Sequence, residues 1–312
     1  MKRLSIIALL ALSLVACSSG SAPRDAVVVV PDGASLTSAA DLLEDAGAIG
    51  SSGEFLRYAK LSGGDEPIKP GEYAVKKGTS GASVLEMMQD GKIVQRFVTV
   101  AEGLPSVIVH DRLMAAPFLT GQIAVPAEGS ILPETYSYQR GEARAAVVKR
   151  MQDAMDKAWA ELWPKRTARS FVTNRNDAMA LAAIVEKETA VDAERRTVAA
   201  VYTNRLRLGM PLQADPTIIY PITKGRPLGR RINRSEIRDV NDYNTYSIAG
   251  LPKGPIANPS KASIAAVLNP NDSKAVYFVA DGKGGHVFAN TLAEHNANVA
   301  KWYAIRRKRG EM

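Results

Sequence analysis

Short apolar runs alternate with helical apolar spacing along the first third of the chain. Residues 27–30 precede a turn at Gly33, and apolar positions three and four apart follow over residues 36–43. The pattern recurs from residue 73 and from residue 97. Each copy predicts a strand, a glycine turn and an amphipathic helix, with helix ends at Gly47 and Gly91. Together these repeats predict a small α/β module over residues 26–118.

The remainder of the chain has longer helical patterns. Residues 142–162 predict a helix within a connecting segment, 119–170. Beyond it, residues 171–312 predict a mixed, mostly helical domain. Its expected elements are a buried helix capped near Asn176 and ending at Glu188, helices at 192–208, 261–268 and 291–307, a strand at 275–280, and long Pro- and Gly-rich loops over 210–259. The fold class is therefore α+β, and such long loops are more often functional than accidental.

The first residues indicate export. Residues 1–16 combine a basic start with an apolar run too short for a membrane-spanning helix, which is typical of a signal peptide. The only cysteine, Cys17, follows directly in a setting that resembles the lipobox of bacterial lipoproteins, where the cysteine is lipidated. Residues 17–25 then form a polar tether. An ordinary cleaved signal and an uncleaved anchor are the alternatives.

Composition narrows the chemistry. The chain has 312 residues, 46% of them hydrophobic, which is ample for a core, and its net charge of +8 suits an anionic partner. The basic residues are spread out without a nucleic-acid signature, so nucleic acid is not an expected partner. The sequence contains no metal-binding, nucleotide-binding or serine-hydrolase motif, and no metal or cofactor is expected. Carboxylate chemistry is the main enzymatic option.

The segment LAAIVEKETA, residues 181–190, places two carboxylates at the end of an apolar run. Burial disfavours the charged form of a carboxylate, so Glu186 and Glu188 are both candidate proton donors. Residues two apart on a helix point about 200° from each other, so only one can face a given cleft. Both lie below apolar stripes, and helix spacing does not choose between them. Both could also simply solvate the helix end.

The loops that follow this helix are rich in side chains that hold sugars. Amide, carboxylate and phenol groups concentrate there, although each such residue taken singly is more often a turn former. The candidates are Gln213, Asp215, Asn241, Tyr243, Asn244, Thr245 and Tyr246.

Four long blocks make a family resemblance specific. They are IVEKETA at 184–190, ERRTVAAVYTNRLRLGMPLQADPTIIY at 194–220, YNTYSIAGLPKGPIANPS at 243–260 and YFVADGKGGHVF at 277–288. In this order they closely resemble the MltG (YceG-like) endolytic murein transglycosylases. The similarity extends forward through LPETYSY at 132–138 to a LysM-like front module, and covers roughly residues 29–303.

The resemblance implies an endolytic lyase that cleaves the β-1,4 bond between N-acetylmuramic acid and N-acetylglucosamine and leaves a 1,6-anhydromuramic end. It assigns catalysis to Glu188, which would act first as acid and then as base, and leaves Glu186 a supporting role. By the same resemblance, Gln213, Asp215, Tyr243, Asn244, Thr245 and His286 are expected near the substrate. No cofactor is implied.

The resemblance also implies a setting. Peptidoglycan glycan strands are the expected substrate, penicillin-binding synthases are expected partners, and the enzyme would terminate nascent strands while attached to a membrane and facing the periplasm. The family favours the inner membrane, whereas Ser18 after a lipidated Cys17 would favour the outer one. A noncatalytic murein-binding lipoprotein that scaffolds the synthases is the alternative function, and a conventional muramidase is a third.

Overall fold

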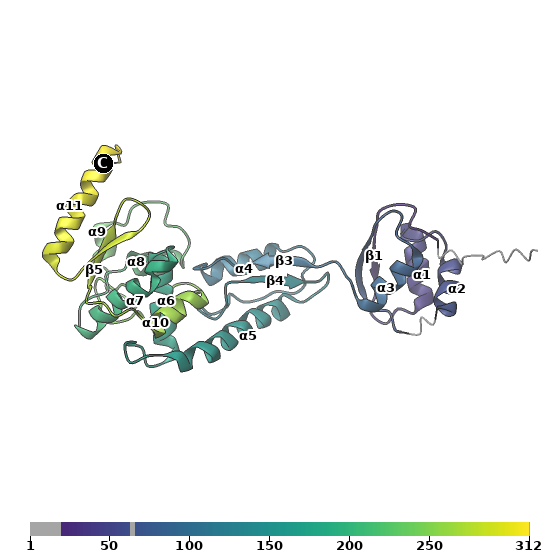
Figure 1. The fold of residues 1–312 in the computed structure, drawn as a ribbon, viewed down its shortest axis with the longest axis horizontal. Coiled ribbons are helices and arrows are strands. Elements are labelled where there is room, and N and C mark those ends of the chain that lie inside the picture. The colour runs from purple at the N-terminus through teal and green to yellow at the C-terminus, as the bar shows by residue number, and fades with distance from the viewer. Residues whose placement is uncertain (1–19, 63–65, 312) are drawn as a thin grey trace, which may run out of the picture. The chain divides into compact units, whose positions relative to one another are not determined.

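The computed structural model describes residues 20–62 and 66–311, which divide into two units, 20–96 and 97–311. Each unit has its own buried core. The signal segment 1–16 and Cys17 lie outside the described residues, so the lipoprotein prediction is not tested there. Within the described part, no helix has the length and hydropathy needed to span a bilayer. Figure 1 labels the elements along the chain.

The first unit combines a two-stranded sheet with three helices. Strands β1 (Ala26–Val30) and β2 (Gly71–Val75) pair antiparallel, with Ala26 opposite Val75. Helices α1 (Leu36–Ala46), α2 (Ser52–Leu61) and α3 (Gly81–Asp90) each begin at a serine whose hydroxyl accepts a backbone N–H. Helix α1 packs on β1, and α2 packs on α1 and α3. Gly47 and Gly91 end α1 and α3 in the left-handed conformation, with φ of 75° and 74°, which confirms both predicted helix ends.

The third strand–glycine–helix repeat belongs to the second unit. Strand β3 (Arg96–Thr99) pairs with β4 (Thr135–Tyr138), not with β1 or β2, and α4 (Ser106–Ala115) follows it. The sequence analysis placed this repeat in a module extending to residue 118. The described first unit instead ends at residue 96, because the partner strand of β3 is supplied from farther along the chain.

Helix α5 (Arg144–Leu162) joins two clusters of buried side chains in the second unit, and a 3₁₀ turn (Trp163–Lys165) follows it. Its Val147 and Met151 pack with β3, β4 and α4, whereas Met155 and Ala158 belong to the larger core. The helical period predicted here is confirmed. Because one helix contributes to both clusters, the connecting segment is an integral part of the second unit.

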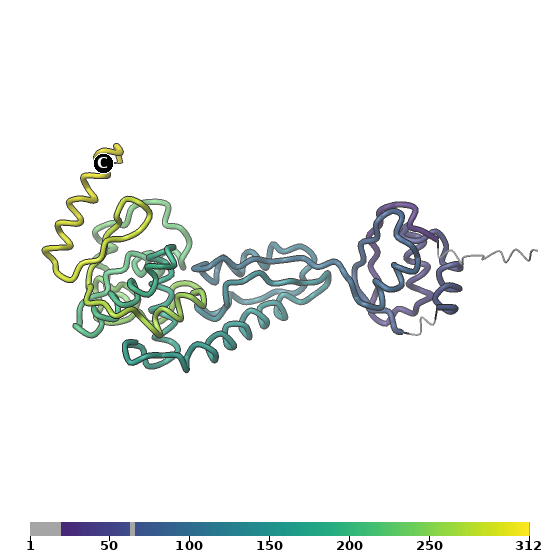
Figure 2. The backbone as a smooth tube through the Cα atoms, in the orientation of Figure 1, coloured from purple at the N-terminus to yellow at the C-terminus, as the bar shows by residue number. Residues whose placement is uncertain are grey.

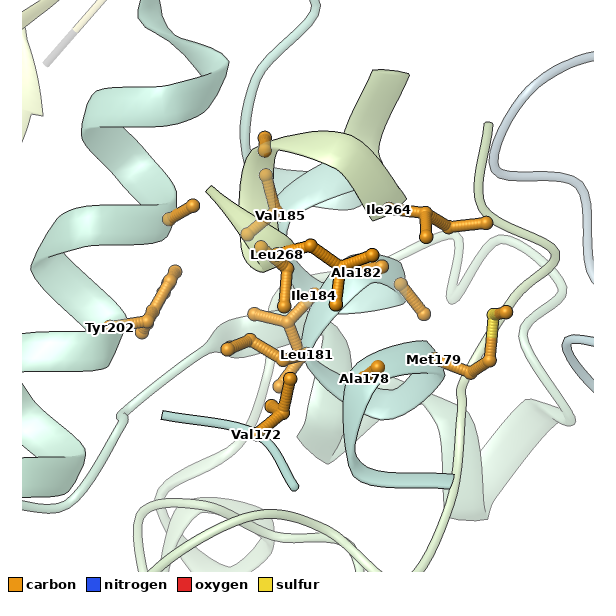
Figure 3. Packing of buried hydrophobic residues seen from close by; sticks show 14 of the residues in the cluster. Val172, Ala178, Met179, Leu181, Ala182, Ile184, Val185, Tyr202, Ile264 and Leu268 are labelled. Carbon is orange, nitrogen blue, oxygen red and sulfur yellow. The ribbon is translucent and has the colours of Figure 1, made fainter. Parts of the chain in front are cut away.

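The larger core is built around α6 (Arg175–Glu188), with α7 (Asp192–Arg207) and α10 (Lys261–Leu268) packed against it. Eight consecutive residues of α6, from Ala178 to Val185, are buried. Figure 3 shows Leu181 and Val185 packed with Tyr202 of α7 and Leu268 of α10. Helix α6 is therefore covered on several sides and holds a fixed position in the unit.

Two short helices lie where the sequence predicted only loops. They are α8 (Asp215–Thr223) and α9 (Arg234–Arg238). Pro216 lies in the first turn of α8, where a missing N–H costs nothing, but Pro221 lies inside the helix. Proline at that position conceals the helical pattern, which is why the loop prediction was wrong for α8.

The chain ends in a hairpin and a helix. Strands β5 (Tyr277–Ala280) and β6 (His286–Ala289) pair antiparallel, and the sequence analysis missed β6. Figure 2 shows the chain passing from this hairpin into α11 (Leu292–Lys308), which packs on β5 and β6. The α+β class is confirmed, with three two-stranded sheets among the described residues.

Candidate active site

Glu188 is the last residue of α6 and lies at the edge of the larger core. The helix begins at Asn174, whose side chain accepts the N–H of Asp177, two residues before the predicted cap. It ends because Thr189 is extended. The buried run from Ala178 to Val185 fixes the helix axis, so the position of Glu188 is fixed as well.

A polar pocket of about 470 Å³ contains Glu188. It lies within the second unit and is lined from α6, α7, α8, the segments before and after α8, β5 and α11. The lining residues are Lys187, Glu188, Tyr202, Arg205, Leu212, Gln213, Asp215, Pro216, Tyr246, Phe278 and His295. The site therefore collects side chains that are more than 100 residues apart in sequence.

The pKa of Glu188 is raised to about 7. Burial is the largest cause, and the negative charge of Asp215 raises it further. A hydrogen bond from Tyr202 and the positive charge of Arg205 act in the opposite direction. Near neutral pH, Glu188 can therefore both give and take a proton.

Two tyrosines and one arginine organise the pocket. Burial raises the pKa of Tyr202 and of Tyr246, so both phenols remain hydrogen-bond donors, and Tyr246 Oη donates to Asp215 Oδ1 at 2.7 Å. The Arg205 guanidinium donates to the carbonyl oxygens of Val276 at 2.7 Å and Leu212 at 2.8 Å. Arg205 thereby links α7 to the residue before β5 and to the segment before α8.

His295 of α11 contributes an aromatic ring to the pocket lining. Its ring stacks on Tyr277 with centroids 5.0 Å apart, and burial together with the charge of Arg205 lowers its pKa. Sequence reasoning missed Tyr202, Arg205 and His295 as pocket residues. Tyr202 and Arg205 are three apart on α7 and so share a helix face, but the sequence does not show that this face meets Glu188.

Of the residues expected near the substrate, Gln213 and Asp215 line the pocket with Glu188. Gln213 has a left-handed backbone, with φ of 53°, and its N–H donates to the carbonyl of Thr245 at 3.0 Å. This backbone turn carries the chain from α7 into α8. Asp215 then begins α8 at the rim of the pocket.

Asn244 and Thr245 are fully buried and do not line the pocket. The Asn244 amide donates to the carbonyl of Asp239 at 2.6 Å and to two further backbone carbonyls. Thr245 Oγ1 accepts the N–H of Ala214 at 3.1 Å and lies 2.9 Å from Thr217 Oγ1. Both residues hold the loop that carries Tyr246.

Tyr243 and His286 also lie outside the pocket lining. Tyr243 packs against Tyr220, with ring centroids 4.9 Å apart. His286 Nδ1 lies 2.8 Å from Glu194 Oε2, and its ring packs at 88° to the ring of Phe278, which does line the pocket. Tyr243 and His286 therefore pack against neighbouring protein side chains and do not line the Glu188 pocket.

Glu186 faces away from this pocket. Its Oε2 atom accepts the N–H and the hydroxyl of Ser260 at the start of α10, and its Oε1 atom lies 3.7 Å from the Arg195 guanidinium. The Glu186 side chain is 5% exposed. The two glutamates that helix spacing could not separate thus have different surroundings. Within the described residues, no group of three or more His, Cys, Asp or Glu side chains could hold a metal ion.

Comparisons with known proteins show which family the chain resembles. The YceG-like family model matches residues 28–301. The chain is 25% identical to a Bacillus subtilis protein named endolytic murein transglycosylase, covering 90% of this chain and 85% of that one. It is 28% identical to a Streptococcus pneumoniae protein of the same name, covering 88% of this chain but only 58% of that one.

A solved structure gives the same result. The crystal structure of a yceG-like protein from Listeria monocytogenes matches with a TM-score of 0.56 and 25% identity, and covers 88% of this chain and 98% of that one. These matches confirm the family resemblance that the four sequence blocks indicated.

Proposed function

The chain belongs to the YceG-like family, and we propose that it is a peptidoglycan lytic transglycosylase that cleaves within glycan strands. The observation that carries this proposal is the Glu188 carboxyl group, which lies in a polar pocket and has a pKa raised to about 7. A carboxyl group with this pKa suits proton transfer in both directions near neutral pH.

The proposed reaction uses one residue twice. Protonated Glu188 donates to the oxygen that leaves when the bond between the anomeric carbon of N-acetylmuramic acid and N-acetylglucosamine breaks. The 6-hydroxyl of the same muramoyl residue then attacks that carbon, and the Glu188 carboxylate takes the hydroxyl proton. The product is a 1,6-anhydromuramic end, and no water is consumed. Because the nucleophile belongs to the substrate, no protein nucleophile is needed.

Substitution of Glu188 tests this proposal. We expect Glu188→Gln to abolish anhydromuramic ends from purified peptidoglycan, detected by mass spectrometry of the soluble products, while the protein remains folded. Glu161→Gln is a matched control, because Glu161 is exposed on α5 and only pairs with Lys165. Anhydro product from Glu188→Gln would contradict the proposal. Reducing ends would indicate a conventional muramidase, and binding without any product from the natural chain would indicate a noncatalytic murein-binding protein.

The cellular role, the partner enzymes and the membrane anchor of the protein are also proposals. We infer that the enzyme terminates nascent strands beside the penicillin-binding synthases, anchored to a membrane through lipidated Cys17 and facing the periplasm. Support comes from the signal-like residues 1–16 and the lipobox-like position of Cys17. Intact mass of the membrane-extracted protein tests the anchor. Loss of residues 1–16 with acyl mass on Cys17 is expected, and an unprocessed Met1 would contradict it.

The first unit is proposed to be a LysM-like glycan-binding module. Its support is the repeated strand, turn and helix, which form a small α/β unit with its own core around Leu43, Phe55 and Tyr73. The test is a pull-down with murein that measures how much of the full chain is retained and how much of a chain lacking residues 26–96. Equal retention of both proteins would remove this role.

A further inference from the structure

A second carboxylate enters the Glu188 pocket from a different element. Glu188 ends α6, whereas Asp215 begins α8 and is exposed at the pocket rim. Asp215 Oδ1 accepts a 2.7 Å hydrogen bond from Tyr246 Oη, and Tyr246 also lines the pocket. The family resemblance assigned catalysis to Glu188 and gave Asp215 only a place near the substrate. The structure places Asp215 beside Glu188 as a candidate partner.

The position of this carboxylate is built into the backbone. The residues before Asp215 bond to the residue before Tyr246: the N–H of Gln213 donates to the Thr245 carbonyl at 3.0 Å, and the N–H of Ala214 donates to Thr245 Oγ1 at 3.1 Å. Asp215 and Tyr246 are therefore each one or two residues from a fixed backbone contact. Their hydrogen bond joins two residues that line the pocket.

Other acidic residues near this region are already engaged elsewhere. Glu194 Oε1 accepts the N–H of His286 at 2.8 Å, and Glu194 Oε2 lies 2.8 Å from His286 Nδ1. Glu236 pairs with Arg230 and accepts the N–H of Asn233. Neither residue lines the pocket that contains Glu188. Of Asp215, Glu194 and Glu236, Asp215 alone lines that pocket.

We propose that Asp215 is a catalytic carboxylate that faces the anomeric carbon of the bound muramoyl residue and stabilises the positive charge that develops there as the glycosidic bond breaks. This inference rests on the proposed function. No bond to Asp215 forms or breaks: the proton passes from Glu188 to the leaving oxygen, and the proton of the 6-hydroxyl returns to Glu188. Tyr246 is a positioning residue that holds Asp215 in place. Fixed charges opposite a developing charge act strongly in such sites.

The electrostatic coupling between the two carboxyl groups supports this arrangement. The charge of Asp215 raises the pKa of Glu188, whereas the Tyr202 hydrogen bond lowers it. Activity that requires protonated Glu188 falls as the pH rises through this pKa. Removing the Asp215 charge must therefore move that fall to lower pH, and removing the Tyr202 hydroxyl must move it to higher pH.

The experiment compares Asp215→Asn, Tyr246→Phe and Tyr202→Phe with the natural chain on soluble, uncrosslinked glycan strands. On the acid plateau, we expect Asp215→Asn to lower kcat by about 10²–10³-fold, the range found when one preorganised transition-state stabiliser is removed, with little change in KM. Tyr246→Phe should lower kcat less. The alkaline limb should shift down for Asp215→Asn and up for Tyr202→Phe. Asp242→Asn is the control, because Asp242 is exposed and pairs with Lys253.

Three results would overturn the inference. One is an Asp215→Asn variant with natural kcat and an unmoved alkaline limb. Another is a rise in KM alone, which would make Asp215 a sugar-binding residue only. If Asp215→Asn does not fold by circular dichroism, Tyr246→Phe decides, and an unchanged kcat for that variant is the third. Failure of the proposed function is distinct, since the natural chain would then produce no anhydro ends at any pH.

Discussion

Ser260 donates both its backbone N–H and its hydroxyl to Glu186 Oε2, at 2.8 and 2.5 Å. This contact joins the last turn of α6 to the start of α10, where the same hydroxyl also accepts the N–H of Ser263. Glu186 thus acts as an anchor between two core helices. Glu188, two residues later, receives a hydrogen bond from Tyr202 of α7 and lines the pocket.

Glu186 should therefore matter for stability more than for chemistry. A Glu186→Ala variant leaves Ser260 without its acceptor and Arg195 without its buried ion-pair partner, and we expect a loss of about 3–5 kcal/mol, the cost of removing one partner of a buried ion pair. Glu186→Gln retains an acceptor oxygen and should lose less. Urea unfolding followed by tryptophan fluorescence measures the second unit, because Trp159, Trp163 and Trp302 all lie there.

The activity of the Glu186 variants provides the control. Glu186→Gln should still form anhydromuramic ends at a temperature where it is folded. A folded Glu186→Gln protein without activity would show that this carboxylate, and not only Glu188, takes part in the reaction.

The pH dependence of the natural enzyme follows from Glu188. Its pKa is raised to about 7, so the protonated form that donates to the leaving oxygen dominates below that pH. We expect kcat/KM to fall as the pH rises through about 7, because the acid form is then lost. Initial rates of anhydro product formation between pH 5 and pH 9, taken as a range of roughly two units on each side, measure this limb. A rate that rises throughout this range would contradict the role of Glu188 as acid.

Much of the scaffold could be predicted from the sequence because it depends on local patterns. The apolar run before Glu188 predicts a buried helix that ends there, and Gly47 and Gly91 predict helix ends that the structure confirms. Patterns of this kind depend on residues three and four apart, which are neighbours in any helix.

The pocket could not be predicted in the same way. Tyr202 and Arg205 reach Glu188 only because α7 turns one particular face toward α6, and this rotation is set by packing among several helices. Asn244 is of a residue type that often binds sugars, but its amide donates to three backbone carbonyls of its own loop. Residue type alone does not distinguish a side chain that binds a sugar from one that binds its own backbone.

Asn244 is therefore expected to act on the loop. Asn244→Ala removes three hydrogen bonds from a fully buried amide to partly buried carbonyl groups, at about 0.5–1.5 kcal/mol for each bond, so we expect a loss of roughly 3 kcal/mol in the free energy of unfolding. In the natural chain the N–H of Tyr246 donates to Asn244 Oδ1 at 3.1 Å, and the variant loses this acceptor as well. Asn290→Ala is the matched control, because Asn290 is exposed and should change stability by less than about 0.5 kcal/mol. A natural unfolding midpoint for Asn244→Ala, with weaker substrate binding, would instead make Asn244 a ligand.

Alanine substitutions at Gly129 and Gly209 distinguish the cost of backbone strain from the cost of a steric clash. Both have a left-handed backbone, with φ of 73° and 66°. A Cβ on Gly129 would lie 2.7 Å from Pro255 Cγ, whereas a Cβ on Gly209 would meet no atom within 4 Å. Gly209→Ala should cost about 1–2 kcal/mol from the backbone alone. Gly129→Ala should cost a further 1–3 kcal/mol or so, because a proline ring cannot rotate away and the backbone must move. Tryptophan-detected urea unfolding of the two variants tests this difference, and equal losses would show that the segment around Gly129 moves freely to accommodate the methyl group.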